Sequence, residues 1–370
     1  MRTKVLEDSP RLFAGAMSGT SLDGIDCVIV EITSRQIKTL NRASVPFSPA
    51  FKRDLEALLV SGPDELRRAA LASNTLAELY AEAFYLALKD ANLTPSSVTA
   101  LGAHGQTVRH APQEAFSVQL LNGAKLALCA GVPVVTDFRS ADIATGGQGA
   151  PLVPAFHAEI FAPFMPCAVL NIGGIANLSF IGHDSVSGFD CGPGNTLIDY
   201  VARKTLGMPF DRDGHLAASG KVSSELLDKM LRDPYFAAPP PKSTGREYFN
   251  EAWLQEKTKD FKDLSPEDLA ATVTALTAQA VCKAFCDAKT DARRLFVCGG
   301  GALNGELMRL LQKALPVCVV SSEDVGIHPM DVEGAAFAWL AAMRVDGRPA
   351  GRPAVTGASR ETILGALYLP

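Results

Sequence analysis

Residues 167–182 read CAVLNIGGIANLSFIG, an apolar run, two glycines and a second apolar run. This pattern predicts a β-hairpin, because strand-forming runs flank residues that favour a tight turn. The same order occurs at residues 11–32, RLFAGAMSGTSLDGIDCVIVEI, with a longer turn rich in Gly, Ser, Thr and Asp. Alternating strand-like and helix-like segments follow each hairpin. The sequence therefore predicts a weak internal repeat of α/β units.

The segments after each hairpin have clear periodicity. In the first half we expect a third strand near 38–47, a long helix within 63–92, strands within 98–107 and 131–139, and a helix near 152–161. In the second half we expect a helix from about 196, a helix near 265–288, a strand and helix within 294–315, a strand at 317–322 and a helix from 331. The long first helix carries an apolar stripe of Leu76, Tyr80, Ala83, Phe84, Ala87 and Leu88.

Length and composition restrict the class of protein. The chain has 370 residues, 47% of them hydrophobic and 20% charged, which favours two globular domains. The formal charge of −5 provides no basic field for nucleic acid or an anionic membrane. We expect no membrane span and no signal peptide. The 8 cysteines form no zinc pattern, which favours reduced thiols and a cytoplasmic location.

Glycine-rich loops follow several of the apolar strands. They occupy residues 17–26, 103–108, 171–178, 189–195 and 298–305. Such loops allow backbone N–H groups to approach a ligand, and N–H groups bind phosphate. A single loop of this kind is more simply a tight turn. Two similar hairpin turns and a third glycine run before a helix favour nucleotide binding, although neither the Walker A nor the Rossmann spacing is present.

Asp190 precedes a Gly-Pro-Gly turn in SGFDCGPGNTLIDYV, residues 187–201. Asn195 and Thr196 are suitable residues to begin the following helix, whereas Asp190 is too early to cap it. Phosphoryl transfer requires phosphate donors and one base that orients the nucleophile. We therefore expect Asp190 to be that base. The alternative is a carboxylate that only braces the turn.

Other polar residues are weaker candidates. Arg139 could bind a carboxylate with two hydrogen bonds, or pair with Asp137 or Asp142. His104 is either a ligand contact or a structural histidine. Glu333 begins an apolar helix, where an acid is either a partner of the helix dipole or a functional group.

Several motifs together resemble the anhydro-N-acetylmuramic acid kinase family. They are MSGTSLDGID (17–26), AHGQTV (103–108), TDFR with GGQGAPLVP (136–154), LNIGGIANL (170–178), GFDCGPGN (188–195), DPYFAAPPPKSTGREYFN (233–250) and VCGGGALN (297–304). They extend from about residue 12 to about residue 341.

The resemblance implies an α/β, two-domain actin-like ATPase fold of the sugar kinase, Hsp70 and actin type. That fold has a duplicated mixed-sheet core and an interdomain cleft for ATP. We expect domains at 11–162 and 163–370. The implied activity is the ATP-dependent hydrolytic opening of 1,6-anhydro-N-acetylmuramic acid and phosphorylation of O6, giving N-acetylmuramic acid 6-phosphate in peptidoglycan recycling. ATP and Mg²⁺ are the implied cofactors, with no metal ligand assigned.

The resemblance also implies residue roles. Asp190 is the expected catalytic base, and Glu333 the expected acid at the anomeric centre. The expected ATP phosphate loop is Gly19, Thr20, Ser21, Leu22, Asp23, Gly24, Ile25 and Asp26. Further expected nucleotide contacts are Asn171, Gly173, Gly174, Gly192, Gly194, Asn195, Gly299, Gly300, Gly301 and Asn304. Expected sugar contacts are His104, Gln106, Thr107, Asp137, Arg139 and Gln148.

Two other functions fit the same loops. An ordinary sugar kinase would transfer phosphate to a free hydroxyl and consume no water. An ATP-driven binding switch of the actin or Hsp70 kind would hydrolyse ATP without a sugar. The expected partners are the anhydro sugar and ATP, with no nucleic acid or membrane, and a homodimer is one option for the assembly.

Overall fold

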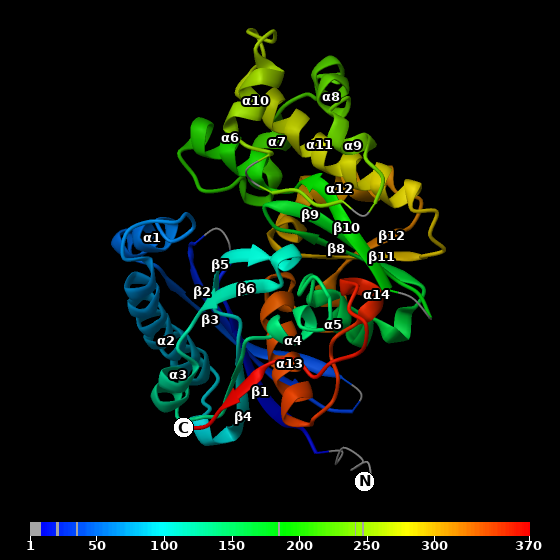
Figure 1. Ribbon diagram of the computed structural model, residues 1–370. Helices are drawn as coiled ribbons and strands as arrows, with labels where there is room; N and C mark the ends of the chain where they lie inside the picture. Colours follow the sequence, from blue (N-terminus) through cyan, green and yellow to red (C-terminus); the bar gives the residue numbers. More distant parts are fainter. Residues whose placement is uncertain (1–8, 20–21, 35, 184–185, 241, 246–247) are drawn as a thin grey trace. The chain divides into compact units, whose positions relative to one another are not determined.

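The computed structural model describes residues 9–19, 22–34, 36–183, 186–240, 242–245 and 248–370. The chain divides into two compact units, coloured along the sequence in Figure 1. Unit 1 holds the described residues up to Ile160 together with Asp331–Pro370, and unit 2 is Phe161–Met330.

Unit 1 contains a 6-stranded sheet in the order β13-β7-β4-β1-β2-β3. Its strands are β1 (Arg11–Met17), β2 (Gly24–Ile32), β3 (Ile37–Pro46), β4 (Val98–Ala103), β7 (Val134–Thr136) and β13 (Ala366–Tyr368). β1, β2 and β3 pair antiparallel, while β4 is parallel to β1 and β7 is parallel to β4. The predicted hairpin and third strand are therefore confirmed. A separate hairpin joins β5 (Gln106–Ala111) and β6 (Phe116–Leu120).

Helices cover both faces of the sheet in unit 1. They are α1 (Pro49–Glu56), α2 (Glu65–Asp90), α3 (Gly123–Ala130), α4 (Ser140–Ile143), α5 (Val153–Ile160), α13 (Val332–Val345) and α14 (Pro353–Thr356). α2 and α3 lie on the opposite side of the sheet from α13 (Figure 1). The predicted apolar stripe of α2 is confirmed, because each of its residues is buried in the core under β1 and β2.

Unit 2 repeats the arrangement with a 5-stranded sheet in the order β10-β9-β8-β11-β12. Its strands are β8 (Cys167–Ile172), β9 (Ile175–Ile181), β10 (Val186–Pro193), β11 (Arg294–Cys298) and β12 (Cys318–Ser321). In both units the first strand is central, the second and third run antiparallel on one side, and the fourth and fifth run parallel on the other. This duplicated core is that of the actin-like ATPase fold, as the motifs predict.

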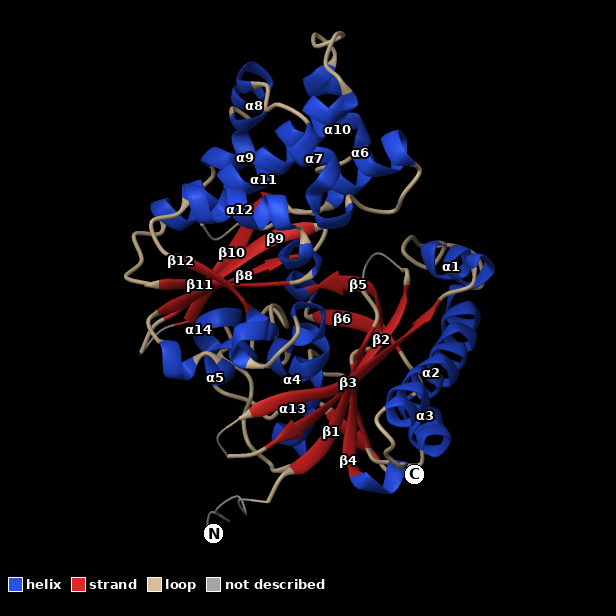
Figure 2. Cartoon of the chain, turned by 180° about the vertical axis from the view of Figure 1, so that it is seen from behind, coloured by secondary structure: helices blue, strands red, loops and turns tan. Residues whose placement is uncertain are grey.

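The helices of unit 2 gather on one side of its sheet, as Figure 2 shows. They are α6 (Thr196–Leu206), α7 (His215–Ser219), α8 (Ser224–Leu231), α9 (Pro234–Ala237), α10 (Glu251–Thr258), α11 (Pro266–Asp287) and α12 (Gly305–Ala314). One helix of the described residues, α11, is long and apolar enough to cross a membrane by length and composition alone. Its most apolar window is 72% buried, because α11 is the helix around which the core of unit 2 forms.

Residues 331–370 belong to a different unit from the one expected. The sequence reading placed them in a C-terminal domain at 163–370, but α13 packs on β1, β2 and β4 of unit 1. Glycines in these strands allow that contact. A Cβ on Gly15 would lie 2.0 Å from the carbonyl oxygen of Gly334, and one on Gly102 would lie 2.1 Å from that of Phe337. The periodicity of the sequence does not predict such close contact between the backbone of α13 and that of the strands, because these residues are far apart in the chain.

Candidate functional site

Several residues of the first hairpin turn pack against other parts of unit 1. Leu22 and Ile25 are buried core residues. A Cβ on Gly24 would lie 2.4 Å from the carbonyl oxygen of Val45, so glycine is needed here for the backbone of β3 to lie close to β2. Thr20 and Ser21 lie outside the described residues. In this turn Gly19 accepts a hydrogen bond from the Leu22 amide.

Two carboxylates of this turn are already engaged. Lys52 donates to Asp23 at 3.0 Å, which joins the turn to α1. The Ser44 hydroxyl donates to Asp26 across the β2–β3 pair. Both aspartates therefore have local partners.

Buried His104 and half-buried Arg139 form a hydrogen-bonded pair in unit 1. The guanidinium of Arg139 lies 2.8 Å and 3.2 Å from His104 Nε2, and its Nη1 donates to the Gly149 carbonyl at 2.6 Å. His104 Nδ1 lies 3.0 Å from the Gly105 carbonyl. Burial, with a further contribution from Arg139, lowers the pKa of His104 to about 3. The imidazole is therefore neutral, with Nδ1–H as donor and Nε2 as acceptor.

Arg139 does not pair with either neighbouring aspartate. The carboxylate of Asp137 accepts from the Ser140 amide and hydroxyl. Asp142 is fully buried and accepts from the Gly149 amide and the Thr356 hydroxyl. Within the described residues Arg139 has no carboxylate within ion-pair distance. Burial lowers its pKa to about 10, so the guanidinium is still charged at neutral pH.

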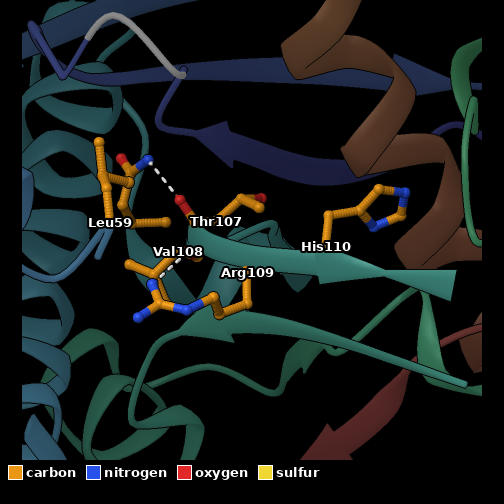
Figure 3. Close-up of a pocket in the computed structure, with 6 residues that line it drawn as sticks. Leu59, Thr107, Val108, Arg109 and His110 are labelled. Carbon is orange, nitrogen blue, oxygen red and sulfur yellow. Dashed lines mark hydrogen bonds between the residues drawn. The ribbon is translucent and has the colours of Figure 1, made fainter. Parts of the chain in front are cut away.

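Gln106 and Thr107 begin β5 beside a small pocket of about 260 Å³ (Figure 3). Leu59 and residues 106–110 line it. Gln106 is buried, and its side-chain oxygen accepts from the Ser18 hydroxyl at the end of β1. Thr107 accepts from Gln119 on β6 at 3.2 Å. This part of unit 1 brings the AHGQTV motif next to the first hairpin turn.

Two further expected residues of unit 1 are Gln148, in a loop, and Glu333, on α13. The side chain of Gln148 is exposed, while its backbone amide donates to the Thr356 carbonyl at 2.8 Å. Glu333 lies half-buried in the first turn of α13. Both alternatives for Glu333, a helix-dipole partner and a functional acid, are compatible with that position.

In unit 2 the structure joins two of the predicted glycine loops directly. The amides of Gly194 and Asn195 donate to the carbonyls of Gly174 and Gly173, both at 2.8 Å. Thr196 also bonds the Gly174 carbonyl, through its amide at 3.1 Å and its hydroxyl at 2.7 Å. Asn195 and Thr196 begin α6 as expected. The amides of residues 194–196 at the start of α6 are therefore already bonded within the protein.

The glycines of these loops fall into two groups. Those packed against protein atoms would clash with any side chain: a Cβ would lie 2.5 Å from the Gly173 oxygen at Gly194, 2.5 Å from the Asn171 side chain at Gly299, 2.4 Å from Ile172 at Gly301 and 2.7 Å from Phe236 at Gly192. At Gly173 and Gly300, in contrast, a Cβ would meet its nearest atoms at van der Waals distance, 3.9 Å and 3.6 Å. These two positions would accept a small side chain without a clash, so packing within the protein does not require glycine there.

Asn304 and Asn171 have structural roles in the same region. Asn304 is buried, and its side-chain oxygen accepts from the Leu307 amide at 3.0 Å, which caps α12. The side-chain oxygen of Asn171 lies 3.8 Å from the thiol of Cys298, at the paired ends of β8 and β11. The two asparagines help to fix the glycine loops.

Asp190 lies half-buried on β10, at a break in the strand pairing. Asp190 pairs with Asn177 and Gly192 with Ala176, so Cys191 is an extra residue that forms a bulge. Bulges reorient side chains and are common near active sites. The Thr244 amide donates to Asp190 Oδ2 at 3.0 Å. Burial raises the pKa of Asp190, although the bond from Thr244 opposes the shift.

Sequence reasoning missed the residues that hold Asp190 in place. The Tyr235 hydroxyl donates to the Asp190 carbonyl at 2.8 Å, and the Asp190 amide donates to the Lys242 carbonyl at 3.2 Å. The Thr277 hydroxyl of α11 bonds the Pro193 and Gly194 carbonyls, each at 3.0 Å. The proline-rich segment after residue 233 was the signal, since such a short stretch inside a domain indicates a shaped loop.

The comparisons with known proteins agree with one another. The family model described as "Anhydro-N-acetylmuramic acid kinase" matches residues 11–370. The chain belongs to the anhydro-N-acetylmuramic acid kinase family. A relative of that name from Variovorax paradoxus (strain S110) is 48% identical over 369 residues, 96% of this chain and 98% of the relative. Another, from Bordetella pertussis (strain Tohama I), is 48% identical over 97% of this chain and 96% of the relative.

Solved structures resemble the chain only at the level of the fold. Component A of (R)-2-hydroxyglutaryl-CoA dehydratase from Acidaminococcus fermentans matches with a TM-score of 0.49 and 12% identity over 90% of this chain and 99% of that one. Likeness at this level carries no information about function. Membership of the kinase family, in contrast, makes the chain a phosphotransferase that uses ATP.

Proposed function

We propose that the chain cleaves the 1,6-anhydro bridge of anhydro-N-acetylmuramic acid with water and phosphorylates the released O6. Water attacks C1, the bond between C1 and O6 breaks, and O6 takes the γ-phosphoryl group of ATP. The products are N-acetylmuramic acid 6-phosphate, ADP and one proton. Capture of O6 by phosphate prevents the bridge from closing again. Such a reaction belongs to the recycling of peptidoglycan.

Asp190 carries this proposal, as the base that removes the proton from water. Its carboxylate is half-buried at a bulge beside the joined glycine loops, and burial raises its pKa. A higher pKa makes a carboxylate a stronger base. Glu333, at the start of α13, is the proposed acid at the anomeric centre.

Two glycines of unit 2 support a nucleotide site. A Cβ at Gly173 or Gly300 would meet the protein only at van der Waals distance, and we propose that the nucleotide contacts unit 2 along the backbone of these two glycines. Mg²⁺ would neutralise charge on the phosphates. The described residues contain no group of three or more His, Cys, Asp or Glu that could hold a metal. This fits an ion held chiefly by phosphates and water, which is usual for Mg²⁺ in kinases.

Arg139 is the proposed contact for the carboxylate of the sugar. Muramic acid has one carboxylate, on its lactyl group, and Arg139 is half-buried, charged and without an acid partner in the described residues. His104 is neutral and accepts from Arg139, so it orients the guanidinium and does not transfer protons. Gln106, Thr107, Asp137 and Gln148 are further proposed sugar contacts. The need for ATP favours a cytoplasmic location.

Isotope labelling tests the reaction against its alternatives. The chain is incubated with ATP and the anhydro sugar in ¹⁸O water, and the products are quenched early, before the hemiacetal exchanges its oxygen. We expect ¹⁸O at C1 and none in the phosphoryl group. An ordinary sugar kinase would incorporate no label. Label in free phosphate with the sugar unchanged would identify an ATPase and refute the proposal.

A further inference from the structure

Asp190 is bonded at three points by residues that follow it in the chain. β10 is the edge strand of the sheet in unit 2, so the backbone groups on its outer side have no strand partner. At Asp190 the Lys242 carbonyl and the Tyr235 hydroxyl take their place, and the Thr244 amide bonds the carboxylate. We call Tyr235, Lys242 and Thr244 the Asp190 clasp.

The clasp is braced internally. Lys242 Nζ donates to the Tyr235 carbonyl at 3.2 Å, and the ammonium lies 4.8 Å from the centre of the Tyr235 ring. Tyr235 also packs edge-on against Phe249, with ring centres 5.4 Å apart. The position of Tyr235 therefore affects two of the three contacts made to Asp190.

Asp233 anchors the clasp to the rest of unit 2. It is only 5% exposed, and its Oδ1 accepts from the Tyr235 amide at 3.1 Å and the Tyr248 hydroxyl at 2.7 Å. Its Oδ2 accepts from Trp253 Nε1 at 2.9 Å and pairs with Lys257 Nζ at 3.0 Å. Although burial acts to raise the pKa of Asp233, the donors from Trp253, Tyr248 and Lys257 hold it below its usual value. The carboxylate stays ionised and fixes the start of α9 to α10.

We propose that Asp233 and Tyr235 are positioning residues for the reaction: Asp233 fixes α9 so that the Tyr235 hydroxyl holds the backbone of Asp190 and aims its carboxylate. The inference rests on the proposed role of Asp190 as the base. Neither residue touches the carboxylate of Asp190 itself. Both act through the backbone of β10, at the bulge that sets the direction of the side chain.

The same contacts keep Asp190 partly shielded from water. The titratable groups that interact with it are Tyr235 from α9 and Cys191 on β10, and the ammonium of Lys242 acts on Cys191. Lys283 and Asp287 of α11 have opposite effects on the pKa of Lys242: Lys283 lowers it and Asp287 raises it. Burial, the larger effect, raises the pKa of Asp190, while the bond from Thr244 lowers it. Loosening the clasp at Tyr235 admits water, and we expect the pKa of Asp190 to move down towards its ordinary value.

The test measures kcat, KM and the pH profile of sugar phosphorylation for Tyr235→Phe and Asp233→Asn. Tyr235→Phe removes one hydroxyl and keeps the ring packing. We expect each variant to lose roughly 10-fold in kcat with little change in KM, since a misplaced base affects the chemical step. Activity requires an ionised Asp190, so the acidic limb of the profile moves to lower pH. A purely structural role would lower the melting temperature without moving that limb.

The double variant and a matched control complete the experiment. If both residues act along one path, the double variant is no slower than the slower single variant. Tyr85→Phe is the control, because Tyr85 also donates to a backbone carbonyl, that of Cys129 in unit 1, at 3.2 Å. It should leave kcat and the pH profile unchanged. Additive losses, or an acidic limb that stays in place, would overturn the inference. Failure of the proposed function would appear differently, as a wild-type chain that does not phosphorylate the sugar.

Discussion

Asp190 shows how a single residue acquires its properties from its surroundings. The sequence shows an acid before Gly-Pro-Gly, whereas the structure adds the bulge, the bond from Thr244 and the burial that raises its pKa. A carboxylate that only braced a turn would bond its own neighbours. Asp190 instead accepts from an amide far along the chain, which favours the functional alternative.

Asp190→Asn should reduce kcat by roughly 10²–10⁴-fold, because the amide cannot accept the proton that a general base removes. The side-chain oxygen can still accept from the Thr244 amide, so nucleotide affinity should stay near the wild-type value. Steady-state kinetics and calorimetric ATP titration measure the two effects. Asp228→Asn, an exposed change in α8 of the same unit, is the control. A rate near that of the wild type would show that Asp190 is a structural brace.

His104 should make unit 1 sensitive to acid. Its pKa is about 3 in the folded chain and near 6.5 when unfolded, so below pH 6.5 the unfolded state binds more protons. Stability is therefore complete above pH 6.5 and falls as the pH drops, by up to about 1.4 kcal/mol per pH unit. Buried His157, also with a pKa of about 3, adds a similar dependence.

His104→Gln should remove the part of the acid-induced loss of stability that His104 causes. His215→Gln, a change at an exposed histidine, should leave that loss unchanged. The measurement is urea unfolding at pH 7 and pH 5, with amide protection in β4 as the probe of unit 1. Equal losses on acidification in wild type and His104→Gln would contradict the assigned neutral imidazole.

At the scale of elements, the glycine loops contain two kinds of glycine that look identical in sequence. Some are required because the protein packs closely against them, and others could contact a ligand. In the run 299–301, a Cβ at Gly299 or Gly301 would clash with β8, while one at Gly300 would meet its neighbours only at van der Waals distance. The two loops that hydrogen-bond to each other differ in the same way, since a Cβ would clash at Gly194 but not at Gly173. Sequence alone predicted the loops as nucleotide contacts, but only the packing separates residues that shape a loop from residues free to touch a ligand.

Gly300→Ala should weaken ATP binding by roughly 10-fold while leaving the melting temperature nearly unchanged, because its Cβ meets no protein atom closer than 3.6 Å. Gly301→Ala should instead destabilise unit 2, because its Cβ would overlap Ile172. Titration calorimetry and thermal unfolding distinguish the two effects. Gly62→Ala, in an exposed loop of unit 1, is a neutral control. Unchanged ATP affinity in folded Gly300→Ala would remove this loop from the proposed site.

At the scale of the whole molecule, the last forty or so residues return to unit 1 after the chain has built unit 2. α13 is almost entirely buried, and it covers the face of the sheet opposite α2. Without it, Phe13, Val28 and Val30 would lose their cover.

A chain that ends at Met330 should therefore lose unit 1 and retain unit 2. Hydrogen exchange is the measurement: we expect fast exchange in β1, β2 and β4, and protection in β8, β9 and β11 close to that of the full chain. A shorter deletion that removes only Leu369 and Pro370, both exposed beyond β13, is the control. Retained protection in β1 and β4 after the longer deletion would show that α13 is not required by unit 1.

The sequence by itself determined the two hairpins, the main helices and strands that follow them, and the glycine loops. Local periodicity and turn residues encode these features, because each depends on residues within one segment. The motifs spread along the chain also indicated the family. Tertiary structure alone decided that 331–370 belongs to unit 1, that Gly15 and Gly102 admit α13, and that Arg139 pairs with His104 and not with Asp137 or Asp142. It also placed Tyr235, Lys242 and Thr244 on Asp190. Those outcomes depend on close packing and hydrogen bonding between segments far apart in the chain. A single sequence does not show which distant segments come into contact.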